Sequence, residues 1–294
     1  MLNMPMVVIS ATLVIFLLCS YPSVATTLLN KLQLPSPVTG PESPAFDRNG
    51  GGPYVSSSDG RIFKYVGPTE GFIEYASTSP NRNKTVCDGL ADFSAAQATC
   101  GRPLGLGFNH QTGDLYVADA YFGLVKIGPY GGNVTQLVGP AQGNSNRFTD
   151  GLDVVPYTGV VYFTEASANF QLKDFETPVN SVDKSGSLLK YDPSTNETTV
   201  LLSNLAVPSG VAVSRDGSFL LVSEYLANRI QRVWRKGPNA NSSELFMLLA
   251  GRPDNIKRNS IGDFWISVNK SVSCIASEYG TEAASEIQEY NGTL

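Results

Sequence analysis

The chain has 294 residues, of which 26 are acidic and 21 are basic, so its formal net charge is −5 at pH 7. It contains no basic run and no interleaved aromatic and basic residues, which argues against nucleic acid as a partner. A single histidine and four cysteines exclude a histidine-ligated zinc site.

The first 25 residues predict a secretory signal peptide. Residues 7–19 form an uncharged run of thirteen, and the small residues Ser23, Val24 and Ala25 follow it. A membrane-spanning helix needs about 20 apolar residues, so this run is too short to serve as an anchor. We expect cleavage after Ala25, which leaves residues 26–294 as one domain without a membrane span.

After the signal, one pattern recurs five times: a first strand, a glycine turn and an aromatic-rich second strand. The turn glycines are Gly50, Gly113, Gly159, Gly217 and Gly262, between 45 and 63 residues apart. In four copies a second hairpin follows, with a Gly-Pro or Asp-Pro turn. This spacing is typical of four-stranded blades, so the sequence predicts an all-β fold of the β-propeller class. A β-sandwich would not keep the same offsets five times.

The residues that begin the first strands are expected to meet around one central channel. Each lies eight or nine positions before its turn glycine, and these ring residues are Glu42, Leu104, Asp150, Ser209 and Asp254, with Asn255 next to the last. Three carboxylates in one pocket repel each other unless they are protonated or bound to a cation.

Calcium takes roughly six to eight oxygen ligands, so the carboxylates and the amide of the ring suit this ion. The candidate Ca²⁺ ligands are Glu42, Asp150, Asp254 and Asn255. The alternative is a structural polar ring, in which these side chains cap strand ends or bond to backbone amides.

The histidine and the cysteines support no catalytic centre of their own. His110 lies in a turn of the second repeat, where an exposed position is expected. Cys87 and Cys100 are thirteen residues apart and flank a polar insertion, which a disulfide could close in an oxidising compartment. Cys274 would then be unpaired. Six Asn-x-Ser/Thr sequons predict a glycoprotein: Asn83, Asn133, Asn196, Asn241, Asn269 and Asn291.

Six segments resemble the strictosidine synthase family of plants. They are residues 40–47, 60–65, 100–103, 158–164, 190–195 and 253–258. The resemblance runs from about residue 32 to residue 270. It implies a six-bladed propeller, a disulfide between Cys87 and Cys100, and transport through the secretory pathway to the vacuole or the cell exterior.

Strictosidine synthases condense tryptamine with the aldehyde secologanin, and the resemblance implies one glutamate as the general base. That glutamate precedes an Ile-Gln-Glu-x-x-Gly segment, which is Ile287–Gly292 here, and Ser285 stands at its position. A serine hydroxyl without a base cannot accept the proton. Glu286 cannot replace the base, because adjacent residues of a strand point to opposite faces. We therefore expect no condensation activity.

The chain also resembles calcium-dependent esterases and lactonases similar to paraoxonase and gluconolactonase. The four candidate ligands match ligand positions of those enzymes in order. Ser209 stands where an asparagine ligand is usual, and Leu104 stands where a catalytic histidine would be. Hydrolysis would then depend on a water molecule activated by the metal.

The C-terminal region departs from the repeat. Only 30 residues separate Gly262 from Gly292, and residues 271–284 lack the glycine–lysine strand and the proline turn of the other outer hairpins. We expect the fifth and sixth blades to be incomplete, as in a splice variant, a mispredicted gene product or a fragment, and the protein to be poorly folded and inactive.

Two functions remain open. The first is a metal-assisted hydrolase that acts on a small ester or lactone, as a monomer with a small-molecule partner. The second is a non-catalytic, regulatory or binding glycoprotein that keeps the fold without the chemistry. Amine–aldehyde condensation is a third and weaker alternative, because of Ser285.

Overall fold

The computed structural model describes residues 31–139, 148–269 and 272–276. The chain divides into two compact units, Met1–Leu32 and Gln33–Leu294, and the described strands and helices belong to the second. The expected signal peptide lies outside the described residues. None of the described helices is long and apolar enough to cross a membrane.

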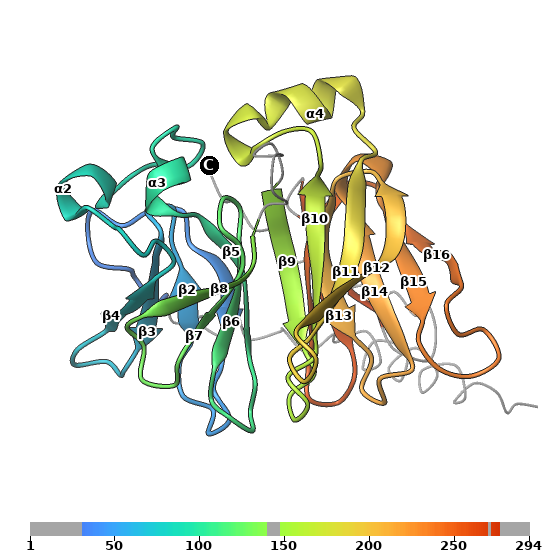
Figure 1. Cartoon of the computed structure of the whole chain (residues 1–294), viewed down its shortest axis with the longest axis horizontal. Helices are drawn as coiled ribbons and strands as arrows, with labels where there is room; N and C mark the ends of the chain where they lie inside the picture. Colours follow the sequence, from blue (N-terminus) through green and yellow to red (C-terminus); the bar gives the residue numbers. More distant parts are fainter. Residues whose placement is uncertain (1–30, 140–147, 270–271, 277–294) are drawn as a thin grey trace, which may run out of the picture. The chain divides into compact units, whose positions relative to one another are not determined.

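The second unit is a series of antiparallel sheets, each of which follows the chain order of its strands (Figure 1). The first two sheets contain β1 (Glu42–Ala45), β2 (Tyr54–Ser56), β3 (Arg61–Tyr65) and β4 (Phe72–Ser77), then β5 (Pro103–Phe108), β6 (Leu115–Asp119), β7 (Gly123–Ile127) and β8 (Val134–Val138). The third and fourth contain β9 (Phe148–Val154), β10 (Val161–Ser167), β11 (Gly186–Asp192) and β12 (Glu197–Leu205), then β13 (Pro208–Val213), β14 (Phe219–Glu224), β15 (Arg229–Trp234) and β16 (Ser243–Leu248). The fifth contains β17 (Arg252–Arg258), β18 (Phe264–Asn269) and β19 (Val272–Ala276). The prediction of an all-β propeller is confirmed.

The sheets have two distinct ends, a turn end and a ring end. The turn end carries the five turn glycines, all of which have positive φ, between 67° and 113°. This conformation is strained for any residue with a Cβ, so the glycines fix the first hairpin of each sheet. The ring end is the opposite end, where the first strands begin.

Short helices and helical turns lie at the ring end in the connections between strands (Figure 1). They are α2 (Lys84–Cys87), α3 (Gln97–Cys100), η1 (Leu172–Asp174), α4 (Glu176–Ser181) and η2 (Tyr225–Ala227). The turn end consists of hairpin loops. The chain therefore places most of its irregular structure on the side of the ring residues.

The first strands of successive sheets pack directly against each other, as β1 on β5, β5 on β9, β9 on β13 and β13 on β17. A glycine follows the ring residue in the second, third and fourth sheets (Gly105, Gly151 and Gly210). A Cβ on Gly151 would lie 2.2 Å from the carbonyl oxygen of Ser209, and one on Gly210 would lie 2.6 Å from that of Asp254. Backbone-to-backbone approach between sheets therefore depends on these glycines.

A hydroxyl on the second strand fixes the same junction from the other side. Thr164 of β10 accepts a hydrogen bond from the Gly151 amide (2.9 Å) and donates one to the Ser209 carbonyl (2.6 Å). In the fourth sheet, Ser223 of β14 accepts a hydrogen bond from the Gly210 amide (2.7 Å) and donates one to the Asp254 carbonyl (2.7 Å). Each hydroxyl thus connects its own sheet to the next ring residue.

The core consists of apolar layers between neighbouring sheets, because alternate residues of each strand face each neighbour. Fully buried members from the first layer to the fourth include Ile62 with Leu106, Leu124 with Phe163, Leu188 with Val222, and Ile230 with Phe264. The fourth strands β8, β12 and β16 lie at the outer edges of their sheets and are largely exposed.

The segment expected to replace the outer hairpin of the fifth sheet, residues 271–284, contains one described strand. Residues Val272–Ala276 form β19, which pairs with β18 and supplies the third strand of the fifth sheet. The segment lacks the glycine and proline signals of the other outer hairpins, and its strand is defined by its pairing with β18. Within the described residues this sheet has three strands. The expected sixth blade and its Ser285 lie outside them.

Candidate functional site

Three carboxylates interact electrostatically at the ring end. Glu42 begins β1, Asp150 lies in β9 and Asp254 lies in β17. The Asn255 side chain donates a hydrogen bond to the Glu42 carboxylate and so connects the fifth sheet to the first. The Ser209 side chain of β13 hydrogen bonds to both Asp150 and Asp254. The structure thus brings together five of the six predicted ring positions.

Burial raises the pKa of all three carboxyl groups, and repulsion within the ring raises it further for Asp150 and Asp254. The pKa of Asp150 lies well above its usual value because of burial first, and then because of the charges of Asp254 and Glu42. Burial, followed by the Glu42 charge, raises the pKa of Asp254 to about 7. Burial also raises the pKa of Glu42, although Arg102 and the hydrogen bond from Asn255 oppose it. The ring therefore favours either protons or a bound cation.

Ser209 opposes the effect of burial on the two aspartates. A hydroxyl has one proton, so it can donate to only one of two carboxylates at a time. The hydrogen bond from Ser209 lowers the pKa of the aspartate that accepts it, and burial still outweighs this effect at both Asp150 and Asp254.

A second polar pair, which sequence reasoning missed, lies one step further along the same strands. Lys257 of β17 reaches across the first strands and donates to the carbonyl oxygen of Leu106 in β5 (3.1 Å). Asp153 of β9 accepts from the Val213 amide of β13 (2.8 Å). Burial lowers the pKa of Lys257 and raises that of Asp153, and the attraction between the two charges partly opposes both shifts.

The sequence shows the spacing of Asp153 and Lys257 from the ring carboxylates, but not the face of the strand on which they lie. Asp153 and Lys257 each lie three residues after a ring carboxylate. In a regular strand that spacing places two side chains on opposite faces, but register shifts occur in the pairing of both strands. A β-bulge of this kind turns positions i and i+3 to one face, and only the folded strands reveal it.

Other predicted residues lie away from the polar ring. Leu104 is 7% exposed and packs in an apolar cluster with Phe148 and Ala166. His110 lies at the turn end, edge-on to Tyr157 with ring centroids 6.4 Å apart. Neither residue can serve as a general base at the ring.

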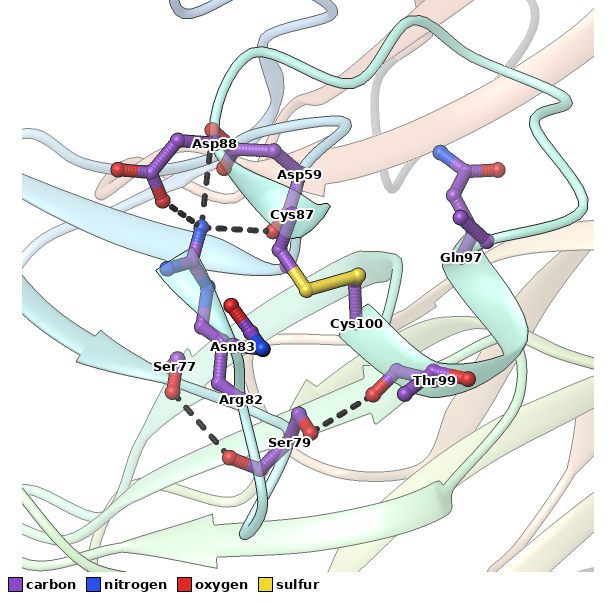
Figure 2. Close-up of a disulfide and its surroundings, with 12 residues drawn as sticks. Asp59, Ser77, Ser79, Arg82, Asn83, Cys87, Asp88, Gln97, Thr99 and Cys100 are labelled. Carbon is purple, nitrogen blue, oxygen red and sulfur yellow. Dashed lines mark hydrogen bonds and ion pairs between the residues drawn. A yellow bond between two sulfur atoms is a disulfide. The ribbon is translucent and has the colours of Figure 1, made fainter. Parts of the chain in front are cut away.

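The insertion between β4 and β5 contains a disulfide between Cys87 and Cys100 (Figure 2). It joins α2 to α3, and both cysteines are fully buried. Arg82 pairs with Asp88 at 2.5 Å, which braces the same loop. The loop that carries the sequon Asn83 is thus tied down at the ring end.

A cavity of about 420 Å³ lies beside Arg252, the first residue of β17, which precedes Asp254 by two residues. Its lining includes Tyr225, Asn228, Arg252 and Asn269. The guanidinium of Arg252 lies over the Tyr225 ring, 5.3 Å from its centroid. The cavity therefore offers a cation, an aromatic face and amide groups to a small polar molecule.

Comparisons with known proteins place this architecture in a family. A sequence profile described as "Strictosidine synthase" matches residues 150–238. The protein strictosidine synthase-like 11 of Arabidopsis thaliana is 38% identical over 308 residues, which cover 97% of this chain and 93% of the relative. The chain belongs to the strictosidine synthase family.

Other members of the strictosidine synthase family are longer than the matched region. Strictosidine synthase-like 10 of Arabidopsis thaliana is 48% identical over 231 residues, which cover 79% of this chain and 61% of the relative. The strictosidine synthase of Catharanthus roseus is 39% identical over 247 residues, or 83% of this chain and 70% of that enzyme. The chain thus spans about three fifths of the length of its strictosidine synthase-like 10 relative.

Solved structures agree on the fold. A putative gluconolactonase has a TM-score of 0.56 at 15% identity, and covers 85% of this chain and 81% of its own. The calcium-binding protein regucalcin of Agrobacterium tumefaciens has a TM-score of 0.57 at 13% identity, with 82% and 71% covered. At these identities the likeness shows the propeller fold alone.

Proposed function

We propose that this family member is a metal-assisted hydrolase that acts on a small ester or lactone at the ring end. The observation that carries the proposal is the hydrogen bond from the Asn255 amide to Glu42 at the ring end, where the charges of Glu42, Asp150 and Asp254 act on one another. The fold likeness to gluconolactonases and to a calcium-binding protein supports this choice over other small-molecule chemistries.

The donor set fits calcium by chemical type. Carboxylate and carboxamide oxygens are hard ligands, and three carboxylates that repel each other gain most from a divalent cation. Glu42, Asp150, Asp254 and Asn255 would hold the ion, and Ser209 would orient the two aspartates. Bound calcium would supply Lewis acidity toward a carbonyl oxygen of the substrate.

This chain's own residues would then do the remaining work. Thr164 and Ser223 hold the backbone of the ring residues, and Arg102 offsets part of the ring's negative charge. The cavity that contains Arg252 and Tyr225 provides a place for the polar part of the substrate.

A second candidate function is non-catalytic binding, and one observation favours it. The polar side chains of the ring hydrogen-bond to one another, Asn255 to Glu42 and Ser209 to Asp150. Among the described residues, no group of three or more Asp, Glu, His or Cys side chains is arranged to hold a metal ion. Condensation of an amine with an aldehyde is the third candidate, and Ser285, outside the described residues, argues against it.

Calorimetric titration with calcium chloride, combined with a panel of esters and lactones, separates the first two functions. We expect calcium binding by the wild type, loss of binding in Asp254→Asn, and calcium-dependent turnover of at least one lactone. Asp192→Asn is the matched control, because this carboxylate lies on β11 near the turn end and pairs with Lys190. Calcium binding without turnover would support the binding function, and no calcium binding would overturn the metal site.

Transport through the secretory pathway is part of the same proposal, with the vacuole or the cell exterior as destination. The buried Cys87–Cys100 disulfide supports it, because such bonds persist in oxidising compartments. The protein would act there as a monomer.

A further inference from the structure

Three of the sequons occupy one structural position in three successive sheets. Asn133 immediately precedes β8, Asn196 immediately precedes β12, and Asn241 lies two residues before β16. Each is therefore in the turn between the third and fourth strand of its sheet. All three are exposed, as are the hydroxyl residues Thr135, Thr198 and Ser243 that complete the sequons.

Strand pairing places these turns at the turn end, away from the carboxylates. In the third sheet, Val161 pairs with Val154 on one side and with Tyr191 on the other, next to the turn that contains Asn196. The ring-end partners of the same sheet are Glu165 and Thr149. A group attached to Asn196 is thus a full strand length from the ring.

The side-chain contacts leave the reactive atom available. Asn196 accepts a hydrogen bond from the Tyr191 hydroxyl through its Oδ1 (3.0 Å), and Asn241 accepts one from Arg235 through its Oδ1 (3.3 Å). An N-linked sugar bonds to Nδ2 and keeps the carbonyl oxygen as an acceptor, so both contacts survive attachment.

Asn269 differs in both respects. It ends β18 at the ring end, and its Nδ2 donates a hydrogen bond to the Tyr225 hydroxyl (3.0 Å). It also lines the cavity at the start of β17. A sugar at this position would displace that contact and fill the cavity.

Two of the three turns lead into edge strands with exposed apolar side chains. Each sequon precedes the strand that is outermost in its sheet among the described residues. In β12, Val200 is 54% exposed, and in β16, Leu245 is 53% exposed. An open edge with apolar side chains is a template for association with other chains.

The first sheet, which has no sequon in the equivalent turn, covers its edge differently. Ala76 of β4 bridges to Gly132 of the second sheet, and the Tyr75 hydroxyl donates to the Gly128 carbonyl (2.9 Å). Among the described residues, the edge of the first sheet thus contacts the second sheet and its turn lacks a sequon, whereas the corresponding turns of the next three sheets carry one.

We propose that Asn133, Asn196 and Asn241 carry N-linked glycans that form a row at the turn end and shield the outer edges of three successive sheets. A lipid-linked oligosaccharide pyrophosphate is the donor. The bond from Nδ2 to the sugar C1 forms, the bond from C1 to the pyrophosphate oxygen breaks, the amide loses one proton, and the lipid pyrophosphate leaves. The row leaves the ring end free for a small-molecule ligand.

The first experiment maps occupancy on the full chain expressed in plant leaf cells. Enzymatic deglycosylation converts an occupied asparagine to aspartate, which peptide mass spectrometry detects. We expect conversion at Asn133, Asn196 and Asn241, and the lowest conversion of the described sequons at Asn269. Absence of conversion at the three turns, or equal conversion at Asn269, would overturn the assignment.

The second experiment tests the shielding role by two independent routes. One triple variant replaces the three asparagines with glutamine, and the other combines Thr135→Ala, Thr198→Ala and Ser243→Ala, which removes the sequons but keeps the asparagines. We expect both to self-associate in size-exclusion chromatography with light scattering, whereas Asn269→Gln stays like the wild type. Monomeric behaviour of both triple variants would overturn the shielding role.

Discussion

A missing Cβ decides how closely neighbouring first strands pack. We expect Gly151→Ala to lower the free energy of unfolding by about 3 kcal/mol, because the new methyl group would overlap the Ser209 carbonyl and backbone must move. Gly128→Ala is the matched control, since a Cβ there meets nothing within 4 Å. Urea unfolding of both variants measures the difference, and equal stability would contradict the close-approach argument.

The Asp59 carboxylate is the clearest source of acid sensitivity. It accepts hydrogen bonds from the Arg61 guanidinium (2.6 Å), the Gly89 amide (3.0 Å) and the Ser57 hydroxyl (2.8 Å). Burial opposes ionisation, but these hydrogen bonds outweigh it and hold the pKa of Asp59 below its usual value. Its stabilisation is therefore present above the unfolded pKa of about 3.9 and is lost as pH falls through the lower folded pKa.

We expect Asp59→Asn to cost about 3 kcal/mol at pH 7, because Arg61 loses its buried charged partner. The penalty should shrink as pH falls below about 4, because the unfolded wild-type chain then binds a proton that folded Asp59 accepts only at its lower pKa. Urea unfolding between pH 7 and pH 3 measures this, with the exposed Glu197→Gln as control. A penalty that is independent of pH would contradict the charge argument.

At the scale of elements, the second-strand hydroxyls connect each sheet to the next ring residue. We expect Ser223→Ala to cost about 1–3 kcal/mol, because it leaves the Gly210 amide and the Asp254 carbonyl without this buried partner. Ser223→Thr should restore most of the stability, since threonine fills the same role at position 164. Thermal unfolding distinguishes the variants, and failure of threonine to rescue would point to packing instead.

The disulfide stabilises the insertion at the ring end. In the chain-entropy model, closing the thirteen-residue separation between Cys87 and Cys100 contributes about 3 kcal/mol. The double variant Cys87→Ser, Cys100→Ser should lose that amount in urea unfolding, and added reductant should affect the wild type alone. A reductant effect of equal size in the double variant would contradict this assignment.

For the whole molecule, one side-chain contact links the fifth sheet to the first. We expect Asn255→Ala to speed amide hydrogen exchange in β1 and β17, because the side-chain hydrogen bond to the buried Glu42 carboxylate is lost. Asn49→Ala, in an exposed turn, is the control. Unchanged exchange in both strands would show that backbone packing alone holds these sheets together.

The sequence by itself determined the repeat and its class. Glycines such as Gly113 and Gly159 adopt positive φ without the strain that a Cβ brings, so the turns were visible before the fold was known. The ring carboxylates were equally visible, because their offset from those turns fixes where the first strands begin. Local backbone chemistry sufficed for both.

Only the tertiary structure decided what surrounds the ring. Asp153 and Lys257 follow register shifts in β9 and β17, and β19 forms by pairing with β18, and neither feature has a clear local signal in the sequence. The equivalence of Asn133, Asn196 and Asn241 also depends on which turn each one occupies. Such features arise from register and from contacts between sheets, which involve residues far apart in the chain.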